Sequence, residues 1–164
     1  MKTLLLVRHA KSSWDSPSLQ DIDRPLNDRG KHDAPAMAKR LLKYDVVIDK
    51  FVSSPAKRAK RTAEYFMEVY DQKEKDLVLV PELYEASVQN FKSTVAMLDD
   101  KHKNVAIFSH NHGITEFAND LTEVTIDNMP TCSIFAVKSS AKSWSAFLEE
   151  KKEFWFFDFP KKDV

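Results

Sequence analysis

The chain has 164 residues, with equal numbers of acidic and basic side chains and a net charge of zero. That length fits a single domain, which we expect to span residues 1–164. The neutral balance argues against a general nucleic-acid or membrane-surface binder, and no apolar run reaches the roughly 18 residues of a membrane span. The single cysteine excludes an internal disulfide and predicts a reducing, cytoplasmic location.

The first elements follow from the apolar pattern. Residues 4–7 are continuously apolar, as expected of a strand that is buried on both faces. The polar segment 12–27 predicts an ordered loop. Residues 30–44 have apolar side chains at helical spacing, and Pro35 predicts either a late start or a kink in that helix.

A second strand and helix follow. Residues 46–52 predict a strand that is again largely apolar. Ser54 and Pro55 then predict an N-cap and a first helical residue, for a helix that ends near Tyr70.

The second half continues the alternation of strands and helices. This order favours an α/β fold with three layers, in which helices flank a mostly parallel central sheet. The expected elements are a strand at 77–80, a helix at 91–98, a strand at 105–108, a helix at 113–121, a late hairpin from 133–137 and 144–148, and an edge strand or docked tail at 154–159.

Basic and imidazole side chains follow three of the predicted strands. Arg8 and His9 end the first, Arg58 lies one turn beyond the second, and His110 follows a later one. Ligands of open α/β sheets bind at the carboxyl ends of the strands. Guanidinium groups bind phosphate bidentately, and imidazoles donate protons or attack phosphorus. The sequence therefore predicts a phosphate site. With only Gly30 and Gly113 in the chain, side chains rather than a glycine-rich loop have to form it.

Five sequence blocks in this order resemble the motifs of the histidine phosphatase (phosphoglycerate-mutase-like) superfamily. The short length and the second and fourth blocks resemble the SixA-type phosphohistidine phosphatases in particular, a branch without the helical insert that covers the site in the mutases. The blocks are Leu6-Val7-Arg8-His9-Ala10, Arg24-Pro25-Leu26-Asn27-Asp28-Arg29-Gly30, Ser53-Ser54-Pro55-Ala56-Lys57-Arg58-Ala59, Leu83-Tyr84-Glu85 and Ser109-His110-Asn111-His112-Gly113.

The resemblance implies roles for individual residues. His9 is expected to be the nucleophile that takes the phosphoryl group. Arg8 and Arg58 are expected to clamp the phosphate oxygens, and His110 to donate a further hydrogen bond. The cations would also keep His9 neutral, as a nucleophile requires. We extend the substrate-binding set to Ser12 and Asn111.

The general acid is open between two glutamates. The family pattern places it at Glu85, which we favour, and Glu82 lies three residues away. A carboxyl that protonates a leaving group needs a raised pKa, which a sequence does not reveal. A phosphoramidate substrate has a comparatively good leaving group and would need no strong acid.

Other reactive residue types have structural interpretations. His32 is expected at the surface, and His102 in the charged turn 99–103 without a function. His112 either lines the site or lies in the first turn of a helix. No third ligand accompanies His110 and His112, so we expect no metal. Cys132 lacks the arginine six residues on that a cysteine phosphatase needs, and is expected to be buried. The aromatic segment 144–159 is expected to pack at the sheet edge, with protein docking as the alternative.

These observations predict a phosphatase with no metal or cofactor, which acts on a phosphorylated protein or a small phosphorylated molecule. The resemblance implies phosphohistidine on a signalling protein as the substrate. Two alternatives stay open: a small-molecule phosphomonoesterase, and a phosphate-binding module without turnover. A mutase would need a closing lid, for which we find no segment.

Overall fold

Strand β1 runs through the middle of a six-stranded sheet in a computed structural model, which describes residues 1–161. Residues 162–164 of the predicted domain lie outside this described part. The strand order is β3-β2-β4-β1-β5-β6. The strands are β1 (Lys2–Arg8), β2 (Lys50–Ser53), β3 (Val78–Leu79), β4 (Asn104–Ser109), β5 (Ile134–Ser139) and β6 (Glu153–Asp158).

The first four strands of that order are parallel, and the last two are not. β1 and β2 both pair with β4 in parallel, and β3 pairs with β2 in parallel. β5 runs antiparallel to β1, and β6 runs antiparallel to β5. The predicted mostly parallel sheet is therefore confirmed, and it carries an antiparallel hairpin at one edge.

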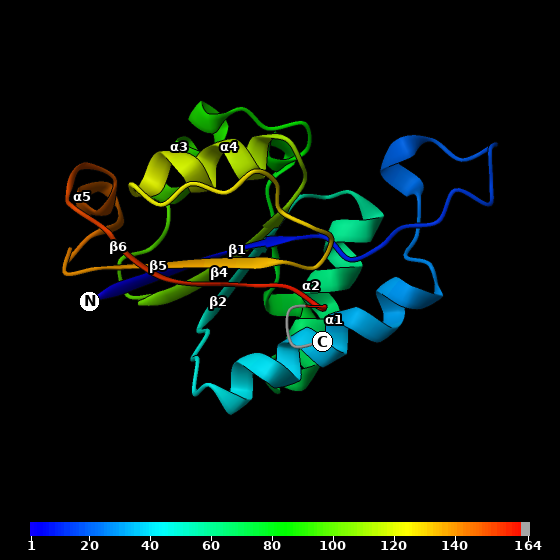
Figure 1. Cartoon of the computed structure of the whole chain (residues 1–164), viewed down its shortest axis with the longest axis horizontal. Coiled ribbons are helices and arrows are strands. Elements are labelled where there is room, and N and C mark those ends of the chain that lie inside the picture. Colours follow the sequence, from blue (N-terminus) through cyan, green and yellow to red (C-terminus); the bar gives the residue numbers. More distant parts are fainter. Residues whose placement is uncertain (162–164) are drawn as a thin grey trace.

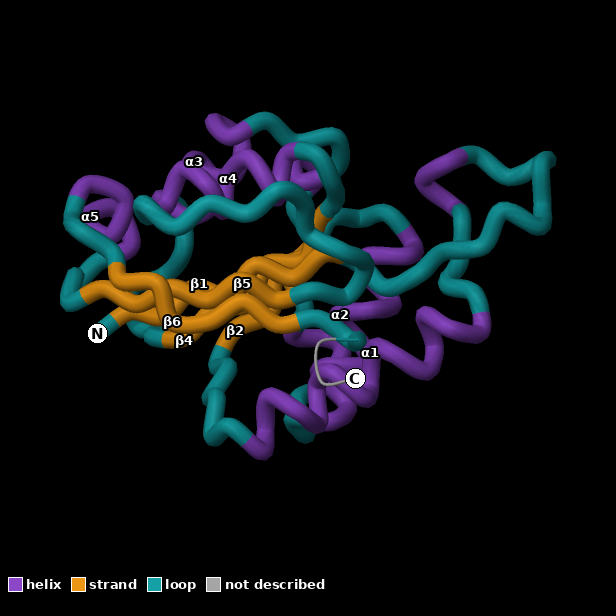
Figure 2. Tube along the Cα trace, in the orientation of Figure 1, coloured by secondary structure: helices purple, strands orange, loops and turns teal. Residues whose placement is uncertain are grey.

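Helices cover both faces of the sheet (Figures 1 and 2). One face is covered by α1 (Asp28–Lys43) and α2 (Lys57–Val69). The other is covered by α3 (Val88–Ala96), α4 (Gly113–Leu121) and α5 (Trp144–Glu149). Short 3₁₀ helices lie at Asp21–Asp23, Glu74–Asp76 and Pro81–Leu83. No helix formed by residues 1–161 has both the length and the apolar character needed to cross a membrane.

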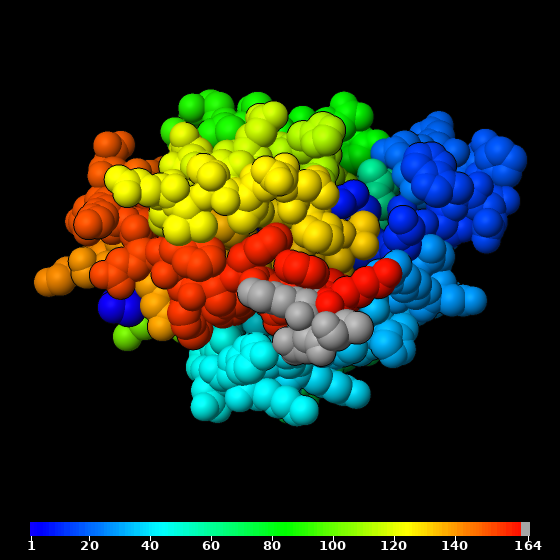
Figure 3. All heavy atoms as spheres, in the orientation of Figure 1, coloured from blue at the N-terminus to red at the C-terminus, as the bar shows by residue number. Residues whose placement is uncertain are grey.

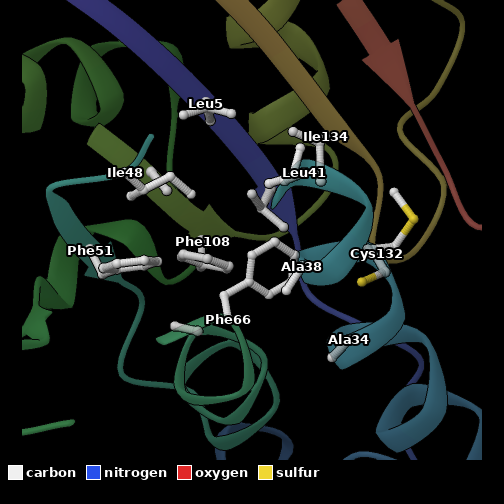
Figure 4. Packing of buried hydrophobic residues seen from close by; sticks show 14 of the residues in the cluster. Leu5, Ala34, Ala38, Leu41, Ile48, Phe51, Phe66, Phe108, Cys132 and Ile134 are labelled. Atoms are coloured by element: carbon white, nitrogen blue, oxygen red, sulfur yellow. The ribbon is translucent and has the colours of Figure 1, made fainter. Parts of the chain in front are cut away.

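The apolar run in β1 serves both layers. Leu5 and Val7 belong to the core cluster under α1 and α2, whereas Leu4 and Leu6 belong to the cluster on the opposite face. Successive side chains of a strand point to opposite faces, so a strand between two helical layers has to be apolar throughout. Figure 4 shows the first cluster, in which the rings of Phe66 and Phe108 meet edge to face.

The start of α1 differs from the prediction in its position. The helix begins at Asp28, because the side chain of Asn27 accepts a hydrogen bond from the Gly30 N–H at 2.9 Å. Pro35 consequently lies inside the helix and does not mark a late start. Its missing N–H costs one backbone hydrogen bond, while the buried face of α1 supplies the compensating packing.

The predicted N-cap at Ser54 is wrong. α2 begins at Lys57 with Ala56 in the N-cap position, and no side chain caps it. The Ser54 hydroxyl accepts a hydrogen bond from the Ala56 N–H at 3.2 Å and also contacts the ring of His110. Ser54 therefore lies before the start of α2, where it contacts His110 and does not cap the helix.

The predicted strand at 144–148 is also wrong. These residues form the short helix α5, because the Ser143 side chain accepts from the Ala146 N–H and caps it. The indole of Trp144 is buried and donates to the His102 carbonyl at 2.8 Å. The edge strand expected at 154–159 is confirmed as β6, and it pairs with β5 in place of the predicted hairpin partner.

Candidate active site

The strand register explains why distant segments of the chain meet. Arg8 on β1 stands opposite Ser109 on β4, so His9 and His110 are the next residues on neighbouring parallel strands. Their ring centroids lie 5.1 Å apart, close to the spacing of adjacent strands. The structure thus brings both histidines to one edge of the sheet, at the carboxyl end of its central strands.

The two glycines allow the surrounding loops to approach this edge. A Cβ atom on Gly30 would lie 2.2 Å from the carbonyl oxygen of Lys11, just after His9. A Cβ atom on Gly113 would lie 2.0 Å from the carbonyl oxygen of Ala86. Any larger residue would push α1 or α4 away from the loops that border the site.

A cleft of about 240 Å³ opens at this edge. Six of the residues predicted from the sequence line it: Arg8, His9, Ser12, Arg58, His110 and Asn111. Four further lining residues were not predicted to act there: Lys11, Trp14, Arg24 and Thr131. None of the residues that line this cleft is acidic, so its charge is positive.

His9 is buried and held in one tautomer. Its Nδ1 lies 2.7 Å from the carbonyl oxygen of Ala10, which only accepts, so the proton of the neutral ring is on Nδ1. Burial lowers the pKa of His9 to about 3; the charges of His110, Arg58 and Arg8 add to this effect, and the Ala10 hydrogen bond opposes it. The ring is therefore neutral at pH 7 and carries its lone pair on Nε2.

His110 is also neutral. Burial, followed by the charge of Arg58, lowers its pKa to about 3. Its Nε2 lies 2.8 Å from the Ser54 hydroxyl, and its Nδ1 is buried without a protein partner. When the hydroxyl donates to Nε2, the ring proton is on Nδ1, which becomes a free donor.

One nitrogen of the Arg8 guanidinium group has a hydrogen-bond partner in the protein, and another has none. Its Nη1 donates to the Met129 carbonyl at 2.9 Å, and its buried Nε has no partner in the protein. Burial and the nearby charge of Arg58 lower the pKa of Arg8. Among residues 1–161, no carboxylate lies within ion-pair distance of this guanidinium group. An uncompensated cation next to a free donor is suited to bind an anion.

Arg58 is positioned by Asp21. Its Nη1 donates to the Asp21 backbone carbonyl at 2.7 Å, and its Nη2 donates to the carboxylate at 3.0 Å. The same carboxylate accepts from the Tyr84 hydroxyl at 2.6 Å and from Arg24 at 3.0 Å. The Tyr84 bond and the two guanidinium groups hold the pKa of Asp21 well below its usual range, and Asp21 raises the pKa of Tyr84 to about 12.

Ser12 and Asn111 line the cleft and also form hydrogen bonds with residues around it. The Ser12 hydroxyl accepts from Arg24 at 2.6 Å and keeps its own proton to donate. The Asn111 amide donates to the Met129 carbonyl, and its oxygen accepts from Thr115 at 2.6 Å. Asn111 thus fixes the segment that carries Met129, which in turn holds Arg8.

The two candidate acids lie outside the cleft lining. Glu85 is exposed and has a left-handed backbone (φ 56°). Glu82 is exposed and lines a different groove, beside β3 and α3. Between them, Tyr84 packs edge to face on His110 at 5.6 Å. The block that predicts a general acid therefore delivers a tyrosine to the site, and the role of Glu85 stays a prediction.

The remaining candidate residues lie away from the cleft lining. His32 and His112 are exposed, and His112 precedes the first residue of α4. Cys132 is buried, as predicted; burial raises the pKa of its thiol, and its N–H donates to the carbonyls of Arg8 and His9. Within residues 1–161, no three His, Cys, Asp or Glu side chains are grouped as metal ligands would be.

Sequence reasoning missed the residues that organise the cleft. Asp21, Arg24 and Tyr84 belong to or adjoin the recognised blocks, but only the fold shows that they meet. The apposition of Asp21 with Arg58 spans 37 positions in the chain. Trp14 gave no signal beyond being an aromatic residue in a polar loop.

Two comparisons of sequence agree with this geometry. A family described as "Histidine phosphatase superfamily (branch 1)" matches residues 4–95. An uncharacterised chloroplastic protein of Arabidopsis thaliana is 29% identical over 153 residues, which cover 87% of this chain and 69% of that protein.

Solved structures share the fold. The protein histidine phosphatase SixA, complexed with tungstate, superimposes with a TM-score of 0.83 at 21% identity, covering 99% of both chains. A mycobacterial glucosyl-3-phosphoglycerate phosphatase superimposes with a TM-score of 0.71 at 16% identity, covering 94% of this chain and 97% of that one. At these sequence identities, the likeness concerns the fold alone.

Proposed function

Since the chain belongs to the histidine phosphatase superfamily, we propose that it is a phosphatase in which His9 attacks phosphorus. One observation carries this proposal. The His9 ring is buried, is neutral and is held through Nδ1, while unpartnered donors on Arg8 and His110 lie around the same cleft. A nucleophile beside unfilled anion donors is the arrangement that phosphoryl transfer requires.

The first step transfers the phosphoryl group to His9. The lone pair on Nε2 attacks phosphorus, and the bond from phosphorus to the leaving group breaks as the new P–N bond forms. Arg8, Arg58 and His110 stabilise the charge on the three non-bridging oxygens. In the second step a water molecule attacks phosphorus, the P–Nε2 bond breaks, and inorganic phosphate leaves with the proton balance restored by solvent.

We propose phosphohistidine on a protein as the substrate. The lining of the cleft holds no carboxyl to protonate a leaving group. A phosphohistidine ring that carries a proton on its second nitrogen leaves as neutral imidazole, whose conjugate acid has an ordinary pKa near 6.5, and it needs no strong acid. Residues 80–87 join β3 to α3 with only the 3₁₀ helix Pro81–Leu83 between them, so this connection has no room for a helical cover over the cleft. The shared fold with the protein histidine phosphatase SixA supports this choice, and the single buried cysteine supports a cytoplasmic setting.

The test is phosphate release from a phosphohistidine protein and from p-nitrophenyl phosphate, with a chelator present. We expect fast release from the first substrate by the wild type and none by His9→Ala. His32→Ala is the matched control, because that ring is exposed and outside the cleft lining, and it should retain full activity. Binding of the phosphoprotein without release by the wild type would contradict the proposal and favour a binding module.

A small-molecule phosphomonoesterase is the second candidate. The volume of the cleft, about 240 Å³, suits a phosphoryl group with a small leaving group, and the fold is shared with a mycobacterial glucosyl-3-phosphoglycerate phosphatase. An alkoxide leaving group needs a proton, so this reading predicts that Glu85→Gln slows hydrolysis of esters. Hydrolysis of sugar phosphates but not of phosphohistidine would favour it.

A further inference from the structure

The indole of Trp14 lies at the mouth of the cleft and is largely exposed. It belongs to the Trp14 loop (residues 13–20), which projects from the body of the molecule beside the carboxyl end of β1 (blue in Figures 1 and 3). The residue is 75% exposed, although it lines the same cleft as His9 and Arg58. A large apolar ring beside a set of cations adds a different kind of surface to the site.

Arg24 holds this ring in place. Its guanidinium carbon lies 3.2 Å from the indole centroid. The guanidinium itself is fixed in its plane: Nε donates to the Ser13 carbonyl, Nη1 to Asp21 and Nη2 to the Ser12 hydroxyl. Arg24 is buried, whereas the indole that lies on it is not. One face of the indole is therefore supported and the other is free.

The supported ring is prepared to bind a second ring. Aromatic side chains stack with favourable energy beyond the area they bury, and a ring held in advance loses little freedom on binding. The cation on the covered face draws electron density from the indole, which favours an electron-rich ring on the free face. Both imidazole and a phenolate fit this description, and both are leaving groups of phosphoryl compounds.

We propose that Trp14 is a platform for planar, ring-shaped leaving groups. This inference rests on the proposed function, because it assigns the phosphoryl group to Arg8, Arg58 and His110 and the remainder of the substrate to the indole. It makes Trp14 a residue that determines specificity, since it favours phosphorylated side chains with a ring over aliphatic phosphate esters.

The first experiment measures binding without turnover. Phenylphosphonate and methylphosphonate have a P–C bond that a phosphatase does not break, so calorimetry gives their Kd values on the intact protein. We expect wild type to bind phenylphosphonate about two- to twelvefold more tightly than methylphosphonate, and Trp14→Ala to bind both equally. Trp14→Phe should restore most of the preference, and Tyr44→Ala, at an exposed ring outside the cleft lining, should not alter it.

The second experiment measures turnover. Trp14→Ala should lower kcat/KM for phenyl phosphate and free N-phosphohistidine by the same two- to twelvefold, and leave phosphoramidate and glycerol phosphate unchanged. Equal losses on ringed and ringless substrates would show a structural role only, and no loss on any would also overturn the platform.

The two proposals fail separately in these experiments. Equal binding of both phosphonates by the wild type overturns the platform and leaves the phosphatase standing. A ring preference in binding without any His9-dependent turnover overturns the phosphatase and leaves Trp14 as a platform for ring-bearing phosphoryl ligands that are bound without reaction. Absence of binding of both phosphonates overturns the platform, and absence of His9-dependent turnover as well overturns both proposals.

Discussion

The cleft at His9 and the groove between β3 and α3 differ in size and in chemistry. The groove encloses about 800 Å³ and the cleft about 240 Å³. Exposed Val78, Leu79 and Met97 line the groove together with charges of both signs, whereas three arginines and two neutral histidines line the cleft. Burying like charges together costs free energy, and a fold keeps such an arrangement where a ligand compensates it. Size alone would point to the groove, whereas the converging cations point to the cleft.

The largest effect should come from removing the uncompensated cation of the cleft. Arg8→Met keeps the length of the side chain and loses its donors, so we expect kcat/KM to fall by about 100- to 1000-fold. Lys50→Met is the matched control: it removes a cation from the groove and should leave the rate unchanged. Steady-state rates on p-nitrophenyl phosphate check both, and an active Arg8→Met would remove the distinction between the two regions.

The stability of the protein should depend on pH through the histidines of the cleft. His9 and His110 have pKa values of about 3 in the folded chain, below the ordinary value of 6.5. The unfolded chain therefore binds more protons between pH 6.5 and 3. The free energy of unfolding is greatest above pH 6.5 and falls as the pH drops, by up to about 1.4 kcal/mol per pH unit for each histidine.

Denaturant titrations at several pH values measure that slope, with substitution of one histidine as the comparison. His9→Gln should reduce the slope between pH 4 and 6, and Met97→Ser in the groove should not. Because the pKa of His9 is about 3, protonation of this residue should not lower kcat/KM near pH 6.5. A wild-type stability that stays level from pH 7 to 4 would contradict the buried, neutral state of both rings.

A smaller effect is expected from the carboxylate that positions Arg58. Asp21→Asn removes the charge shared by Arg58, Arg24 and Tyr84, and we expect kcat/KM to fall about three- to tenfold. The carboxylate is half-exposed, so solvent moderates the loss. The pKa of Tyr84 should also fall from about 12 toward 10, which an ultraviolet titration of the variant and of Tyr84→Phe would measure.

The smallest effect is expected in the groove itself. Met97 is 87% exposed, so Met97→Ser should change the free energy of unfolding by less than about 0.5 kcal/mol. Turnover of every substrate should stay within about twofold of the wild type, since the groove contributes no group to the cleft. A marked loss of activity would mean that the two regions are coupled.

Much of the fold follows from local pattern. The helix 113–121 agrees with α4 at both ends, because Gly113 starts a regular apolar stripe. The run 4–7 predicts a strand with two buried faces, and β1 is one. The predictions failed where a single side chain decides between alternatives. Ser54 and Ser143 are both good N-caps, yet Ser143 caps a helix and Ser54 instead contacts a histidine 56 positions away.

The residues of the site likewise fall into those that local sequence pattern predicted and those that it did not. Arg8, His9, Arg58 and His110 were predicted because parallel strands that end in basic residues have to meet at one edge. Asp21 and Trp14 were not, because each acts through a pairing across an irregular loop, for which no periodicity exists. Glu85 shows the opposite case, in which the block is recognisable and the side chain lies outside the cleft lining.

The central position of β1 also determines when the cleft can be completed during synthesis of the chain. Lys2–Arg8 is made first, yet its partners are Asn104–Ser109 and Ile134–Ser139. At ribosomal rates β4 follows about 10 s later, and until then the apolar strand lacks both of its neighbours in the sheet. His9, the proposed nucleophile, is therefore made long before the rest of the cleft, and a chaperone that shields the N-terminus would be needed most before β4 emerges.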